Sequence, residues 1–184
     1  MKKQIQCKAC KYIMTEDSNY EVCPACGVPR SAFESYEDKV SYKRRKIINL
    51  HLHPIMVHFP QAISTLIPPA ILFTYIMPYF GKELFSTAIV LSLVLPASVI
   101  PAILAGLIDG KTRFKKLGTP HMRHKIYLAI ILFCLSLILP ISILLINDSV
   151  LLKIILLATS ILCVFCQMLL GKIGSTLMEA VLPG

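Results

Sequence analysis

The residues in this sequence that are best suited to chemistry are four cysteines near the amino terminus. They form two Cys-x-x-Cys pairs, Cys7 with Cys10 and Cys23 with Cys26, and twelve residues separate the pairs. Two such pairs form turns that can face each other and close a tetrahedral site of four thiolates. Thiolates favour Zn²⁺ or iron over harder cations. The spacing therefore predicts a four-cysteine metal site, and it leaves iron and zinc open because both accept this ligand set.

Disulfide bonds are the alternative use of four cysteines, and they require an oxidising compartment. The residues after Lys2 and Lys3 are polar and do not form the apolar segment of a signal peptide. The polar part of the chain is also too short to bury a self-sufficient core. A structural zinc ion supplies about 10–16 kcal/mol of folding free energy in finger peptides. We therefore favour a metal site over disulfides.

The sequence around the cysteines resembles the rubredoxin-like domain of rubrerythrins, over roughly residues 5–35. The matching features are the segment Cys-Pro-Ala-Cys-Gly-Val-Pro at 23–29 and the later Phe33. The resemblance implies one iron, held by the four cysteines, that moves single electrons between the ferrous and ferric states. One position departs from the family, because Lys11 stands where glycine usually follows the second cysteine. The alternative is a zinc ribbon with the same four ligands and no redox chemistry.

The rest of the chain has the composition of a membrane protein. The sequence is 55% hydrophobic and only 16% charged, whereas soluble domains have about 25% charged residues. Four long stretches contain no charged residue, and a membrane span needs about 20 apolar residues. The sequence predicts helices near 55–80, 84–108, 126–147 and 150–170. The expected architecture is a small metal-stabilised β knuckle domain, rubredoxin-like, followed by an all-α four-helix transmembrane bundle.

Basic residues predict the orientation of these helices, because cytoplasmic loops carry an excess of Lys and Arg. The cluster at 43–46 precedes the first span, and six more basic residues lie between Gly110 and Lys125. We read the cluster as an anchor to anionic lipid headgroups rather than a nucleic-acid contact. The sequence thus predicts a multi-pass protein of the cell membrane, with both termini and the knuckle in the cytoplasm.

The second group of candidate residues consists of histidines. All five histidines fall at the predicted cytoplasmic ends of the first and third helices, and Asp109 closes the second helix on the same side. The segments also resemble an uncharacterised family of bacterial four-span membrane proteins with a His-Pro…His-Phe-Pro motif, over about residues 50–170. The candidate cofactor-binding residues are His53, His58, Asp109, His121 and His124.

Three readings of this group stay open. One histidine from each helix, such as His58 and His124, would suit the two axial positions of a b-type haem. The second reading is a quinone pocket, or a second metal, at His53, His58 and Asp109. The third has no cofactor: the histidines reach lipid headgroups, and Asp109 pairs with a nearby arginine. Cys163 and Cys166 are expected to be small buried residues rather than a redox pair.

These observations predict four segments: a metal domain at 1–35, a basic juxtamembrane linker at 36–52, a transmembrane domain at 53–172 and a cytoplasmic tail at 173–184. The sequence has no nucleophile–base pair and no phosphate-binding glycine loop, so we expect an electron carrier rather than a stand-alone enzyme. The iron centre would exchange electrons with a soluble redox protein and a membrane acceptor, through a haem or quinone at the histidines. The alternative is a zinc-ribbon adaptor that recruits a protein to the bilayer.

Overall fold

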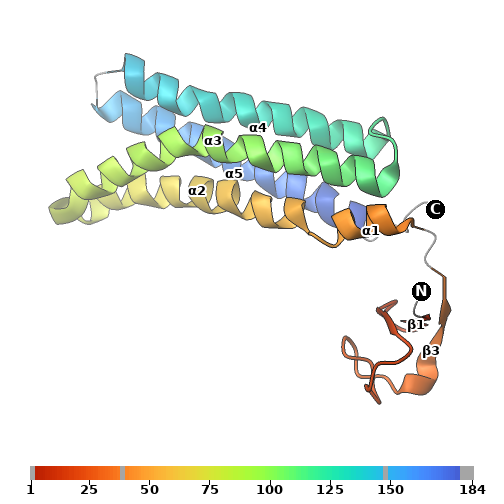
Figure 1. The fold of residues 1–184 in the computed structure, drawn as a ribbon. Coiled ribbons are helices and arrows are strands. Elements are labelled where there is room, and N and C mark those ends of the chain that lie inside the picture. The colour runs from red at the N-terminus through yellow and green to blue at the C-terminus, as the bar shows by residue number, and fades with distance from the viewer. Residues whose placement is uncertain (1–2, 38–39, 147–148, 179–184) are drawn as a thin grey trace. The chain divides into compact units, whose positions relative to one another are not determined.

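The computed structural model describes residues 3–37, 40–146 and 149–178 (Figure 1). The chain divides into two compact units, one at Met1–Tyr42 and one at Lys43–Pro183. The division follows the change in composition from polar to apolar sequence.

The first unit contains a small antiparallel sheet. Its strands are β1 (Gln4–Cys7), β2 (Ile13–Thr15) and β3 (Phe33–Tyr36), in the order β2-β1-β3. In the central strand, Ile5 lies opposite Met14 on one side and Ser35 on the other. A short 3₁₀ helix, η1 (Arg30–Ala32), precedes β3. The expected knuckle domain is therefore confirmed as a three-stranded fold.

The long loop between the cysteine pairs is held by one arginine. The guanidinium of Arg30 donates hydrogen bonds to the backbone carbonyls of Glu16, Ser18 and Tyr20, the last at 3.0 Å. A planar guanidinium offers five N–H donors in a fixed geometry, which suits several carbonyls at once. Arg30 thereby orders a polar segment that has little apolar surface to bury.

The second unit is helical. Its elements are α1 (Tyr42–Ile48), which spans the unit boundary, α2 (Leu52–Ile76), the short 3₁₀ helix η2 (Pro78–Phe80), α3 (Gly81–Phe114), α4 (Pro120–Leu145) and α5 (Ser149–Met178). Four helices in the described residues are long and apolar enough to cross a membrane. This confirms the four predicted spans.

The predicted helix ends were less accurate. Helix α3 continues past residue 108 to Phe114, α4 begins at Pro120 instead of 126, and α5 runs beyond 170 to Met178. The predicted ends followed the charge-free stretches, but Lys and Arg are good helix formers. Lys111 and Arg123 are exposed, so their charged ends reach water while the backbone stays helical. The helices therefore extend into the basic segments.

The four long helices pack side by side, α2 against α3 and α5, and α4 against α3 and α5 (Figure 1). The core between them includes Ile67, Leu95, Leu139 and Leu156, all 0% exposed. Many large apolar side chains point outward instead, which suits a lipid environment. At one end of the bundle, Arg44 of α1 donates to the carbonyl of Thr112 at 3.0 Å.

Candidate metal centre and bundle cavity

The four cysteines predicted as ligands come together. The sulfur atoms of Cys7, Cys10, Cys23 and Cys26 all lie within 4.8 Å of one another. The Sγ atoms of Cys7 and Cys26 are 3.8 Å apart, and those of Cys10 and Cys23 are 3.6 Å apart. A tetrahedron with metal–sulfur bonds of about 2.3 Å has edges of about 3.8 Å. The spacing of the sulfurs therefore fits a tetrahedral iron or zinc ion.

The two cysteine turns have the same backbone hydrogen bonds. In the first turn, the Lys11 N–H donates to the Cys7 carbonyl at 2.9 Å, and the Cys7 N–H donates to the Tyr12 carbonyl at 2.8 Å. In the second turn, the equivalent bonds join Gly27 to Cys23 at 2.8 Å and Cys23 to Val28 at 2.7 Å. Two matching knuckles therefore present their sulfurs from opposite sides of one site.

Lys11 keeps the turn geometry although it replaces the usual glycine. Its φ angle is 62°, close to the 75° of Gly27 at the matching position of the second turn. For a residue with a Cβ, this left-handed conformation costs about 1–2 kcal/mol. Lys11 therefore adopts the turn conformation of the usual glycine at a cost in backbone strain, and the hydrogen bonds of the first knuckle are kept.

Backbone N–H groups point at the sulfurs. The Tyr12 N–H donates to Cys10, the Cys26 and Ala25 N–H groups donate to Cys23, and the Val28 N–H donates to Cys26. Such dipoles stabilise the negative charge of metal-bound thiolates and tune the potential of an iron centre.

The thiols interact strongly with one another. Burial raises the pKa of Cys23, but the N–H groups of Cys26 and Ala25 and the neighbouring thiols of Cys26 and Cys10 together lower it more, so the pKa falls to about 7. For Cys26, the Val28 N–H lowers the pKa, whereas the neighbouring Cys10 thiol and burial raise it, to a net value of about 12. The Cys26 thiol by itself therefore stays protonated near neutral pH. A bound cation would supply the positive charge that favours its thiolate.

The sulfurs differ in exposure. Cys7 and Cys23 are buried, whereas Cys10 and Cys26 are exposed. Lys8, Lys11 and Tyr12, next to Cys10 in the chain, are exposed as well. The site thus has an inner pair of ligands and an outer pair that reaches the surface beside two lysines.

Replacing Lys11 with Gly is expected to stabilise the metal-loaded knuckle by about 1 kcal/mol, because glycine adopts positive φ without strain. The lost ion pair with Glu34 is long, at 3.8 Å, and exposed, so it contributes little. The measurement is the denaturant midpoint for metal release.

Lys11→Ala keeps the strain and serves as the control. Gly27→Ala introduces the same strain with no atom within 4 Å of the new Cβ, so it should destabilise by a similar amount. Equal midpoints for Lys11→Gly and Lys11→Ala would contradict the assignment.

The structure separates the histidine candidates into two groups. His53 and Asp109 line a cavity of about 480 Å³ inside the helical unit. His58, His121 and His124 are exposed and do not line it. His51 is also exposed, and its ring nitrogen Nδ1 lies 2.7 Å from the Asn49 carbonyl. Haem ligation by His58 and His124 stays a prediction.

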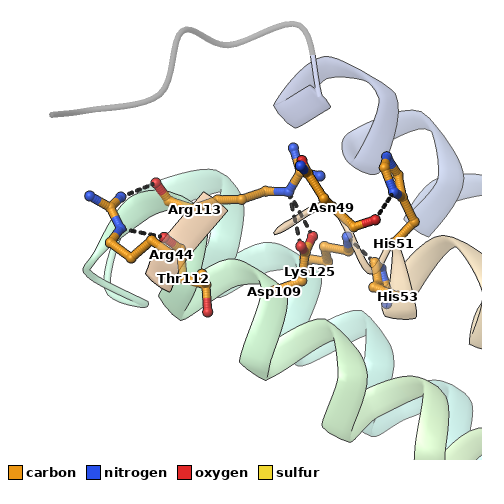
Figure 2. Close-up of polar contacts among 8 residues, drawn as sticks. All are labelled: Arg44, Asn49, His51, His53, Asp109, Thr112, Arg113 and Lys125. Carbon is orange, nitrogen blue, oxygen red and sulfur yellow. Dashed lines mark hydrogen bonds and ion pairs between the residues drawn. The ribbon is translucent and has the colours of Figure 1, made fainter. Parts of the chain in front are cut away.

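Polar side chains from α2, α3 and α4 line the cavity where these helices meet. Figure 2 shows four of them, His53, Asp109, Arg113 and Lys125. The Lys125 Nζ atom lies 3.0 Å from Nε2 of His53. Nearby, Arg113 Nε lies 3.0 and 2.9 Å from the two carboxylate oxygens of Asp109. This ion pair agrees with the reading in which Asp109 pairs with a nearby arginine.

Four polar cavity residues were missed as site candidates: Gln61, Arg113, Lys125 and Gln167. Arg113 was considered as a basic residue that sets membrane orientation and as a possible partner of Asp109, and Lys125 was considered only as a basic residue. Gln167 of α5 bridges to α2, where its Nε2 donates to the Pro60 carbonyl at 3.1 Å and its Oε1 accepts from Ser64 Oγ at 2.9 Å. Gln167 is an amide residue inside a predicted membrane span, and that was the available signal.

A comparison with protein-family models matched one family, the rubredoxin-like domain of rubrerythrin, at residues 6–34. No curated protein and no solved structure matched the chain. The matched segment contains all four cysteines and ends within β3. Residues 6–34 are therefore a rubrerythrin-type rubredoxin-like domain with a four-cysteine cluster, and four helices long and apolar enough to span a membrane follow it in the chain.

Proposed function

We propose that the protein is a membrane-anchored electron carrier whose rubredoxin-like domain holds one iron. The observation that carries this proposal is the four-cysteine cluster within a rubrerythrin-type domain. Bound iron would supply a one-electron couple between the ferrous and ferric states.

Cys7, Cys10, Cys23 and Cys26 hold the ion, and the backbone N–H groups aimed at their sulfurs stabilise the charge of the reduced form. Cys10 and Cys26 reach the surface, so they form the contact edge for a soluble redox protein. The exposed Lys8 and Lys11 beside that edge favour a partner with an acidic surface. The helices keep the domain at the bilayer, near an acceptor dissolved in lipid.

Metal content and visible absorption of the full-length protein test this proposal. Protein purified from cells supplied with both iron and zinc should contain about one iron per chain. It should also show thiolate-to-iron charge-transfer bands that bleach on reduction. Cys26→Ser should remove the bands, whereas Cys134→Ser, at an exposed position on α4, should leave them unchanged. A colourless protein with stoichiometric zinc would overturn the electron-carrier proposal and leave a zinc-ribbon membrane adaptor.

The same spectra test the haem reading. A Soret band that is lost in His58→Ala or His124→Ala would assign a b-type haem. A protein that shows only the iron–thiolate bands after expression with ample haem would remove haem as the acceptor and leave another membrane acceptor.

The proposed location is the cell membrane, with both termini in the cytoplasm. The support is the distribution of basic residues between loops. A fluorescent protein that folds only in the cytoplasm should be bright when fused to either terminus, and an alkaline phosphatase fused there should be inactive. Active phosphatase at either terminus would overturn this topology.

A further inference from the structure

The cavity in the helical unit has the size and composition of a small-molecule site. Its volume is about 480 Å³, within the range of about 300–1,000 Å³ typical of ligand pockets. Helices α2, α3, α4 and α5 all contribute to it, and most of its walls are apolar, with Val57, Val99, Leu107 and Met122 among them. The site lies between helices that span the bilayer, so an amphiphile from the lipid phase is the natural class of ligand.

The polar end of the cavity carries an ammonium group that forms no ion pair with a carboxylate among the described residues. Asp109 is held by Arg113 through both carboxylate oxygens, so these two charges cancel. Lys125 makes one hydrogen bond, to Nε2 of His53, and no ion pair among the residues that the structure describes. An ammonium has three N–H donors. Two remain for a ligand, and the net positive charge of Arg113, Lys125 and Asp109 together favours an electron-rich oxygen.

His53 holds Lys125 in place. In the neutral imidazole, Nε2 accepts from Lys125 only if the proton is on Nδ1. The ring lies against α3, where a Cβ on Gly106 would approach its Cε1 to 3.0 Å. Gly106 therefore leaves room for the imidazole, and the imidazole orients the lysine. His53 is a positioning residue for the Lys125 donor.

A second donor lies deeper in the cavity. Gln61 lines the same cavity, and its side-chain amide has no hydrogen-bond partner within residues 3–37, 40–146 and 149–178. It follows His53 by eight residues on α2, which is about 12 Å along the helix axis. A fatty acid needs donors at one end only, whereas a quinone ring has carbonyl oxygens at two opposite ends. The two separated donors favour a quinone.

We propose that this cavity binds a membrane quinone. One ring carbonyl accepts from the Lys125 ammonium, the other accepts from the Gln61 amide, and the isoprenoid tail lies along the apolar walls. The choice of a redox-active lipid rests on the proposed electron-carrier function. The binding site itself rests on the cavity and its two donors.

Binding of decylubiquinone to the full-length protein in lipid nanodiscs tests the proposal. Hydrogen bonds to charged groups contribute about 1.5–3 kcal/mol, so Lys125→Met should weaken binding by about 10-fold to 100-fold. Lys172→Met removes a lysine from α5 that does not line the cavity, and it should leave the Kd unchanged. Gln61→Leu should weaken binding several-fold.

Three further variants separate recognition from folding. His53→Leu should weaken binding, and His53→Gln should restore it, because the glutamine oxygen also accepts from Lys125. Gly174→Leu should block the site, because a Cβ at Gly174 would lie 3.6 Å from Lys125 Nζ. If Lys125→Met fails to fold, Gln61→Leu and Gly174→Leu still decide the question.

Binding is measured on iron-loaded and zinc-loaded protein alike, so the two proposals fail independently. Zinc in the native protein together with quinone binding would overturn only the electron-carrier function. Iron with no measurable quinone binding would overturn only the quinone site. The site is also overturned if oleate binds and decylubiquinone does not displace it, or if Lys125→Met and Gly174→Leu both bind quinone like the parent protein.

Discussion

Replacing Cys23 with Ser is expected to abolish stable metal binding and unfold the amino-terminal unit, while the helices remain folded. Cys23 is buried at 2% exposure, and with Cys7, Met14 and Val40 it forms the small interior of that unit among the described residues. Three strands of three or four residues do not hold together without support. Structural zinc in comparable peptides contributes about 10–16 kcal/mol, far more than the marginal stability of a small domain. Loss of one ligand therefore removes the main source of stability.

Metal analysis measures the loss of the metal, and hydrogen exchange measures the unfolding residue by residue. Amides in β1, β2 and β3 should lose protection in Cys23→Ser, and the amides of α2 to α5 should keep theirs, because the two units are separately compact. A chelator applied to the parent protein should produce the same pattern. Cys163→Ser is the matched control, since Cys163 is equally buried, at 0%, but lies in the helical unit. Retained strand protection in the chelated parent would show that the metal is not the source of stability.

The cluster of four cysteines could be predicted because the spacing of the cysteines determines it almost alone. Two Cys-x-x-Cys turns present sulfurs with little freedom, and the structure brings all four within 4.8 Å. The conformation of Lys11 could not be predicted in the same way. Its left-handed φ depends on whether metal binding and the knuckle hydrogen bonds stabilise the turn by more than the strain of a Cβ costs. The local sequence does not determine which of the two is larger.

The histidines show what helical spacing leaves undetermined. His53 and His58 are five residues apart, which places them about 140° apart around a helix, so one faces the cavity when the other faces outward. The spacing gave this separation, but it did not say which of the two faces inward. Similarly, His124 is exposed while the next residue, Lys125, reaches the cavity. The choice of face follows from packing between α2, α3 and α4, which a single sequence does not specify.

The ion pair between Asp109 and Arg113 should give the second large effect. Arg113 is only 8% exposed, so Asp109→Asn leaves a buried guanidinium without its carboxylate partner. Breaking a buried pair by removing one member costs about 3–5 kcal/mol. We expect Asp109→Asn to lower the free energy of unfolding in mixed micelles by about 3 kcal/mol.

The double variant Asp109→Asn/Arg113→Met distinguishes two costs: the lost interaction between the two side chains, and the burial of a charge that has no partner. It removes both charges, so most of the stability should return, because replacing a buried pair with neutral side chains is often harmless. Arg113→Met alone should cost less than Asp109→Asn, since the ammonium of Lys125 also attracts the Asp109 carboxylate. This order has a physical cause: the cavity holds two cations and one anion, so it tolerates the loss of a cation better than the loss of its only carboxylate among the described residues. A double variant as unstable as Asp109→Asn would mean that geometry, rather than unpaired charge, sets the cost.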